Sequence, residues 1–184
     1  MELLIVIAII GIMTTVGLVS LSSSRTNTKL QAAQREVASV IKLTQSYALQ
    51  GKVADDGTGS GNMITPCGYG FRFKDSGSYE IFYNNWTTGG WGKTDCTSMN
   101  GDFNDRYWKN GPPHSKTLAS FQLNNGVTLS SSVAATEIYF TVPDGGIYDN
   151  TGNAYAGSQI FTFSLSSATK NITFDSGGSV AESN

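Results

Sequence analysis

The first 24 residues carry an almost unbroken apolar pattern. After Glu2, no charged residue occurs until Arg25, and Leu, Ile, Val, Ala and Met fill most of the positions between them. As an α-helix rising about 1.5 Å per residue, this segment is long enough to cross a hydrocarbon core of about 30 Å. The favourable insertion energies of its many strong hydrophobes outweigh one acid at the edge of the segment. We therefore predict that residues 1–24 form a transmembrane helix.

Residues 25–50 show a different pattern, in which apolar side chains recur at steps of three and four. The series consists of Leu30, Ala33, Val37, Val40, Ile41, Thr44, Tyr47 and Ala48. This spacing places one apolar stripe along a helix and leaves its other face polar. No proline occurs before Pro66, and Gly51 is a typical helix stop. We predict one continuous helix from about residue 2 to residue 50.

From residue 51 onward the pattern changes to short segments with a period of two. A glycine-rich connection over 51–65 leads into alternating segments that are separated by turn residues. The predicted strands are 69–73, 79–83, 117–123, 127–129, 137–142, 159–165 and 170–174. The first two should form a hairpin, and Asn125-Gly126 predicts a second hairpin between 117–123 and 127–129.

These elements predict an α+β fold. The amphipathic half of a long N-terminal helix should pack on an antiparallel β-sheet domain of about seven strands. The predicted division of the chain is 1–24, a hydrophobic half-helix; 25–50, an amphipathic half-helix; and 51–184, a C-terminal β-rich globular domain.

Composition and charge fit an exported β-rich domain. Charged residues make up 14% of the chain, against about a quarter in typical soluble domains. The net charge of −2 provides no basic field of the kind that nucleic acid needs. Specific nucleic-acid binding is therefore not predicted.

The two cysteines, Cys67 and Cys96, both lie in the β-rich part of the chain. An even number of cysteines in an exported domain favours a disulfide, and no CxxC spacing or histidine cluster suggests zinc. We predict that Cys67 and Cys96 pair, with two unpaired thiols as the alternative.

Basic residues follow the apolar span, and none precedes it. They are Arg25, Lys29, Arg35 and Lys42. Under the positive-inside rule, either the C-terminal part is cytoplasmic or a basic leader precedes the given sequence. The low charge and the cysteine pair of the β-rich part favour the second explanation. The acidic start and the long apolar segment argue against a cleaved secretory signal peptide.

The segment 84–114 holds all three tryptophans, Trp86, Trp91 and Trp108. A connection of this length in a compact domain is often functional. One interpretation is an aromatic platform that contacts a glycan or a protein partner. The other, which the irregular spacing favours, is that the aromatic rings pack the loop against the sheet.

Catalytic chemistry has little support in the sequence. His114 is the only histidine, and no nucleophile elbow, phosphate loop, zinc motif or dinucleotide fingerprint accompanies it. Glu80 and Glu137 could meet in space as paired carboxylates, but nothing in the sequence selects them. Asp55-Asp56 lacks the spaced oxygen ligands of a calcium loop. We expect a non-enzymatic protein without a metal or another cofactor.

The segment from Glu2 to Met13, Glu-Leu-Leu-Ile-Val-Ile-Ala-Ile-Ile-Gly-Ile-Met, closely resembles the N-terminal methylation segment of type IV pilins and type II secretion pseudopilins. The rest of the chain is similar in pattern to the H-type minor pseudopilins and related minor pilins. This similarity rests on the amphipathic half-helix, the Tyr69–Phe73 strand, the Ile138–Phe140 strand before Pro143, and the closing Ile172–Phe174 strand.

The resemblance implies a structural filament subunit whose apolar half-helices bundle in the filament core. Before assembly, the same half would anchor the subunit in the inner membrane by a single pass, with the β domain outside. The subunit would then join a periplasmic or extracellular filament. The implied partners are other pilin or pseudopilin subunits, a prepilin peptidase and an assembly platform.

Glu2 matches a conserved acid of this family. In family members, this acid is thought to pair with the N-terminal amine of a neighbouring subunit. A carboxylate among apolar helices is costly unless it finds such a partner. The alternative is an interfacial acid at the end of a simple anchor. Members of the family begin with a basic leader that is removed after a glycine, whereas only Met1 precedes Glu2 here. We therefore expect that the given sequence lacks its natural start.

A second functional hypothesis does not involve assembly. It is a membrane-anchored extracellular β domain that binds a glycan or a protein partner through Trp86, Trp91 and Trp108.

Overall fold

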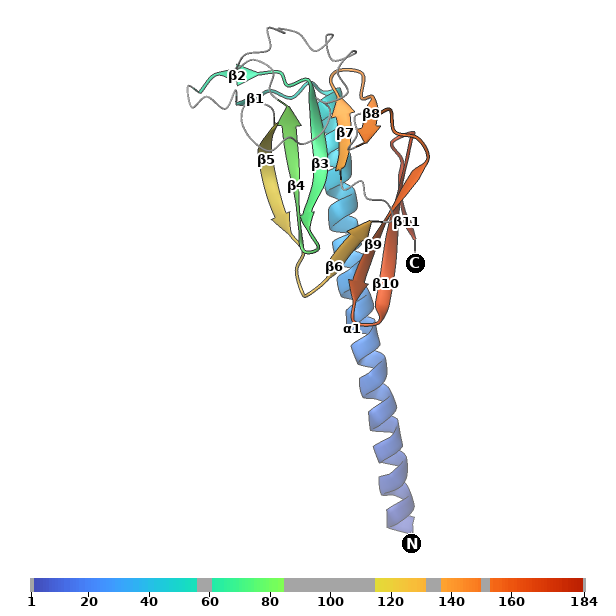
Figure 1. Cartoon of the computed structure of the whole chain (residues 1–184). Coiled ribbons are helices and arrows are strands. Elements are labelled where there is room, and N and C mark those ends of the chain that lie inside the picture. Colours follow the sequence, from blue (N-terminus) through green and yellow to red (C-terminus); the bar gives the residue numbers. More distant parts are fainter. Residues whose placement is uncertain (1, 56–60, 85–114, 132–136, 150–152, 184) are drawn as a thin grey trace.

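The computed structural model describes residues 2–55, 61–84, 115–131, 137–149 and 153–183. One long helix, α1 (Glu2–Leu49), carries a β domain on its C-terminal half, and its N-terminal half extends away from that domain (Figure 1). Gly51 has φ of 58°. Its N–H donates to the carbonyl of Ala48, and the N–H of Lys52 donates to the carbonyl of Tyr47. This is the left-handed glycine ending that the sequence predicts.

The described residues contain eleven strands in three antiparallel sheets. The strands are β1 (Ala54–Asp55), β2 (Met63–Ile64), β3 (Gly68–Asp75), β4 (Ser78–Asn84), β5 (Ser115–Gln122), β6 (Thr128–Ser131), β7 (Glu137–Thr141), β8 (Ile147–Asp149), β9 (Ser158–Leu165), β10 (Ala168–Asp175) and β11 (Val180–Ser183). The sheet orders are β1-β2, β5-β4-β3-β7-β8 and β11-β10-β9-β6. The α+β class and the antiparallel pairing are thus as predicted.

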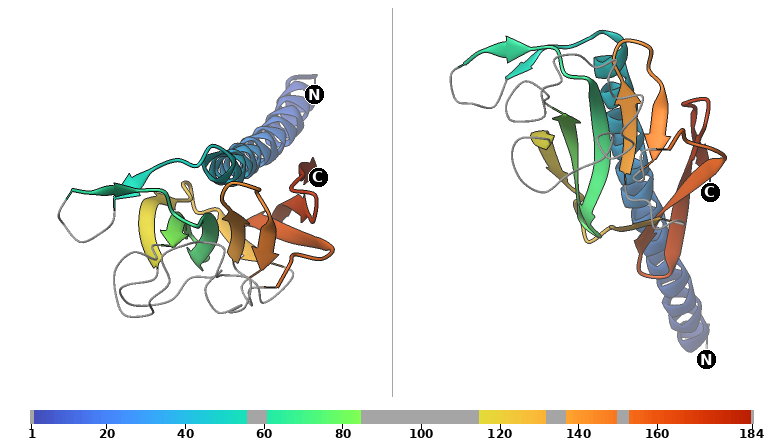
Figure 2. Two further views of the ribbon diagram at one scale, coloured as in Figure 1. Left: turned by 90° about the horizontal axis from the view of Figure 1, so that it is seen from above. Right: turned by 45° about the horizontal axis from the view of Figure 1, so that its top comes forward.

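The strands differ from the prediction in number and in grouping. All seven predicted segments are strands, but β1, β2, β8 and β11 span only two to four residues each, which is too short for a clear alternation. The predicted β3–β4 hairpin forms, with Phe71 opposite Ile81. The two larger sheets lie along one side of α1 (Figure 2).

The predicted hairpin between β5 and β6 is wrong. The turn itself forms, with φ of 64° at Asn125 and 73° at Gly126. However, β5 pairs with β4, and β6 pairs with β9 in the other sheet. The N–H of Leu129 donates to the carbonyl of Ser76 at the β3–β4 turn. The chain therefore runs past the end of the β3–β4 hairpin before it enters the other sheet as β6. Asn125 and Gly126 therefore link two sheets.

The core lies between the two larger sheets and the second half of α1. The buried apolar residues of the helix are Leu30, Ala33, Val37, Ala38, Val40, Ile41 and Ala48, and Gln34 and Thr44 are buried among them. Aromatic rings join the sheets: the centroids of Phe71 and Phe161 lie 6.4 Å apart, and those of Phe140 and Phe174 lie 6.0 Å apart. The apolar stripe predicted over 25–50 is thus the face that packs on the β domain.

Polar contacts also fix the helix on the sheets. The Tyr79 hydroxyl donates to Glu36 Oε1 at 2.7 Å. Gln34 Nε2 donates to the carbonyls of Asn171 at 2.6 Å and Ser183 at 3.1 Å. Because these bonds tie α1 to β4, β10 and β11, the helix has one defined rotation and height on the β domain.

Candidate functional site

The N-terminal half of α1 is an exposed apolar surface. The large hydrophobic side chains that are described in this half are between 50% and 73% exposed: Leu3, Ile5, Val6, Ile7, Ile9, Ile10, Ile12, Met13, Val16 and Leu21. The first buried side chain described along the helix is Leu30. A continuous apolar surface of this length is unfavourable in water, so it needs lipid or other helices to cover it.

This half of the helix is long and apolar enough to cross a membrane. Its most apolar window of 18 residues has a mean hydropathy of 2.4, and none of that window is buried. The core helix of a soluble protein meets the same criterion of length and composition, but such a helix is mostly buried. A signal sequence meets it as well. What distinguishes α1 is that the apolar window continues without a break into a helix packed on a folded domain.

The two threonines in the middle of this half are satisfied by the helix itself. The hydroxyl of Thr14 donates to the carbonyl of Ile10 at 2.8 Å, and that of Thr15 donates to the carbonyl of Gly11 at 2.9 Å. A hydroxyl that bonds to the preceding turn needs no water. Both threonines are therefore compatible with an apolar environment.

Most of the predicted site residues lie beyond the described side chains. Glu2 is the first residue of α1, and its side chain is not described. Cys67 is disulfide-bonded, and the only other cysteine in the sequence, Cys96, lies outside the described residues. Also outside them are Trp86, Trp91, Trp108 and His114.

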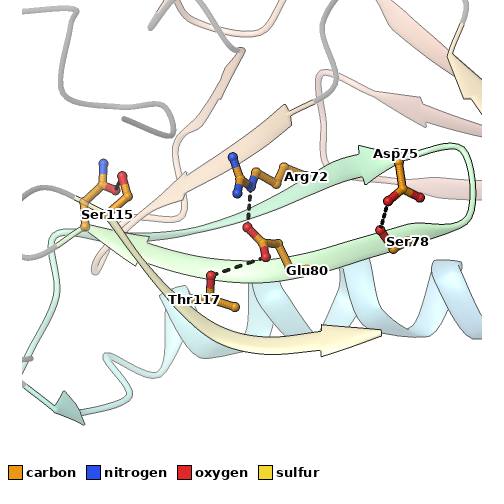
Figure 3. A network of polar contacts seen from close by, with 7 residues as sticks. Arg72, Asp75, Ser78, Glu80, Ser115 and Thr117 are labelled. Atoms are coloured by element: carbon orange, nitrogen blue, oxygen red, sulfur yellow. Dashed lines mark hydrogen bonds and ion pairs between the residues drawn. The ribbon is translucent and has the colours of Figure 1, made fainter. Parts of the chain in front are cut away.

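The structure separates the two strand acids by an arginine. Arg72 on β3 lies opposite Glu80 of β4 and Glu137 of β7 in the sheet register. The side chains of Arg72 and Glu80 form an ion pair, and Thr117 Oγ1 donates to the other Glu80 oxygen at 3.3 Å (Figure 3). Because the charge of Glu80 is compensated and hydrogen-bonded, this network has the character of a fixed structural element of the sheet.

Of the Asp55-Asp56 pair, only Asp55 belongs to the described residues. Asp55 is exposed, and its main-chain carbonyl accepts from the Tyr83 hydroxyl at 2.7 Å. In the part of the chain that the structure describes, no group of three or more His, Cys, Asp or Glu side chains is placed to hold a metal ion.

A groove lies beside α1 where the helix leaves the β domain. It has a volume of about 770 Å³ and is lined by Ser20, Ser23, Ser24, Asn27, Thr28 and Gln31 of α1 and by Thr169 and Lys170 of β10. No local sequence pattern predicts this groove, because the helix residues and the β10 residues that line it are separated by well over a hundred residues of chain.

No protein-family model, curated protein or solved structure matches the chain. Function is therefore inferred from the sequence pattern and from the geometry of α1 and the β domain.

Proposed function

We propose that this protein is a structural subunit, a pilin or minor pseudopilin, of a type IV pilus-like or type II secretion filament. The observation that supports this best is the division of α1 into an exposed apolar half and a half packed on the β domain. A pilin-like subunit needs this division, because one half of the helix polymerises while the other holds the folded domain.

The exposed half suits both lipid and a filament core. Lipid tails and neighbouring apolar helices are similarly apolar, so transfer between them keeps this surface out of water. A Cβ added at Gly11 or Gly17 would meet no atom of another part of the protein within 4 Å, so both positions lie open on the helix surface. Small residues of this kind allow helices to approach closely. The subunit can therefore leave the inner membrane and enter a helix bundle without a large loss of apolar burial.

We infer that the β domain lies outside the inner membrane and later on the surface of a periplasmic or extracellular filament. The disulfide at Cys67 supports this topology, because disulfides persist mainly in oxidising compartments. The partners in this proposal are other subunits of the filament, together with the prepilin peptidase and the assembly platform that the resemblance implies.

Glu2 is the residue that we assign to assembly. At the start of α1, its carboxylate would enter an apolar bundle, where a charge needs a partner such as the N-terminal amine of a neighbouring subunit. Glu2→Ala should leave membrane insertion intact and lower incorporation into filaments by roughly a hundredfold or more, since breaking a buried charge pair costs about 3–5 kcal/mol.

The test compares Glu2→Ala with Glu182→Gln in cells that express the assembly machinery. Glu182 is a partly exposed acid on β11, so its variant controls for the loss of one negative charge. Membrane fractionation measures insertion, and quantitative immunoblotting of sheared filaments measures incorporation. Normal incorporation of Glu2→Ala contradicts the role of Glu2. Two results together would support the anchored binding domain instead. The wild-type protein would insert without self-association, and its glycan binding would be lost on Trp86→Ala, Trp91→Ala or Trp108→Ala.

A further inference from the structure

The groove beside α1 combines two elements at the boundary of the folded domain. One wall is the helix from Ser20 to Gln31, and the other is Thr169 and Lys170 at the start of β10. The β9–β10 turn is the part of the β domain nearest to the exposed half of the helix (Figure 1). The groove therefore begins where the apolar surface ends.

The lining of the groove is polar and contains several side chains that can donate hydrogen bonds, although the Thr28 hydroxyl already donates to the carbonyl of Ser24. It presents serine and threonine hydroxyls, the amides of Asn27 and Gln31, and the ammonium group of Lys170, and none of the described residues that line it is a carboxylate. Within the described chain, the side chains of Ser20, Asn27 and Gln31 make no hydrogen bond to protein atoms. This set of groups matches an anionic oxygen ligand such as a phosphate ester.

Lys170 is the one charged residue among the described residues that line the groove. Arg25 and Lys29 are exposed on the same turns of α1, but the helical repeat places them on the side of the helix away from the groove. The neighbouring acid on β11, Glu182, lies 3.9 Å from Arg35, so its charge is offset. An anionic surface would therefore be attracted to this end of the domain.

The position of the groove along the helix axis corresponds to the surface of a membrane that the apolar half would span. Leu21 is the last large apolar residue of the exposed half, and Ser20 to Gln31 extend over about 16 Å of helix. The headgroup layer on each side of a bilayer is roughly 5–8 Å thick. When the apolar half spans the bilayer, Ser20 to Ser24 lie at the headgroups, and Lys170 lines the same groove as Ser20 and Ser24.

We propose that this groove binds the phosphate headgroup of an anionic phospholipid and so seats the β domain on the membrane surface before assembly. The inference rests on the proposed membrane anchoring of the subunit. It adds a ligand class and a binding site on the β domain to that function.

The experiment measures lipids retained by the full chain after release from nanodiscs that contain equal amounts of phosphatidylglycerol and phosphatidylcholine. Native mass spectrometry counts the bound lipids. The wild type should retain phosphatidylglycerol preferentially, and Lys170→Gln should retain about fivefold less, which is the typical effect of one basic residue at an anionic surface. Lys42→Gln, at an exposed helix position outside the groove, should behave as the wild type does. Lys170→Arg should restore retention.

Several outcomes would overturn the proposal. Equal retention by the wild type and a folded Lys170→Gln variant excludes a headgroup site. Equally tight binding of inorganic phosphate without a bilayer indicates a site for free phosphate, and loss of filament incorporation without a change in lipid retention indicates a contact between subunits. A wild-type chain that does not enter bilayers at all contradicts the proposed anchoring as well, which separates that failure from failure of the groove alone.

Discussion

Replacing the same residue type in the two halves of α1 should destabilise the folded domain in one half and leave its stability unchanged in the other. Ile41 is fully buried against the β domain, whereas Ile10 is 57% exposed on the same helix. Truncation of a buried isoleucine to alanine removes its apolar contacts and leaves a cavity, at a cost of about 2–5 kcal/mol. Alanine has a higher helix propensity than isoleucine, so neither change disrupts the helix itself.

The expected magnitudes separate the two variants clearly. For a chain of this size, 1 kcal/mol shifts the thermal midpoint by about 2–4 °C, so Ile41→Ala should lower it by about 4–20 °C. Ile10→Ala should leave the midpoint unchanged. It should weaken membrane insertion by only about half a kcal/mol, which is the contribution of one isoleucine to a spanning helix.

Thermal unfolding of the full chain in detergent micelles, followed by near-ultraviolet circular dichroism, measures both effects. The detergent covers the exposed half, and the aromatic core provides the signal. If Ile10→Ala destabilises the domain as much as Ile41→Ala does, the division of α1 into two environments is wrong. An unchanged midpoint for Ile41→Ala would likewise refute the packing of residues 30–48 on the sheets.

Two further predictions concern the β domain. Gly70→Ala should destabilise it by about 1–3 kcal/mol, because the added Cβ would collide with the ring of Phe82. Gly77→Ala should be tolerated, because the nearest atom to a Cβ at that position is Asp75 Oδ1 at 3.6 Å. The midpoints of urea unfolding of the two variants test the difference. Burial, and then the nearby phenols, raise the pKa of Tyr69 from 10.0 to about 12. Since the folded pKa exceeds the unfolded one, the associated stability is complete below about pH 10 and is lost as pH rises from about 10 through about 12. Stability measured against pH should fall in that window, and it should fall less in Tyr69→Phe; equal slopes for the two proteins would contradict this.

The helix and most strands could be predicted because their signals are local. The change from a continuous apolar run to an apolar stripe with steps of three and four predicts the two halves of α1. Gly51 predicts the end of the helix, because glycine adopts the left-handed backbone conformation that commonly follows a helix. The alternation of Tyr69, Phe71 and Phe73 likewise predicted a strand, because its core face is set by the strand's own period.

Pairing between distant segments could not be predicted in the same way. Asn125 and Gly126 specify the dihedral angles of a turn, but they do not specify which strands pair beyond it. Leu129 is buried in the core, and this long-range packing directs β6 to β9. The position of Arg72 between Glu80 and Glu137 depends on the register of three strands, and the groove depends on β10 approaching the helix. The predicted role of Glu2 came from the local sequence resemblance.

The short polar segment between the two halves of α1 explains how one helix serves two environments. From Leu21, the last large apolar residue of the exposed half, to Leu30, the first buried one, the helix advances about 13 Å. The residues between them are too polar for lipid and are not patterned for the core, and the hydroxyls of Thr26 and Thr28 donate to the carbonyls of Ser22 and Ser24. Because the helix is continuous here, there is no free linker between the apolar half and the β domain. In a subunit anchored through its apolar half, this segment therefore holds the domain close to the membrane surface, at the height where the groove meets the headgroups.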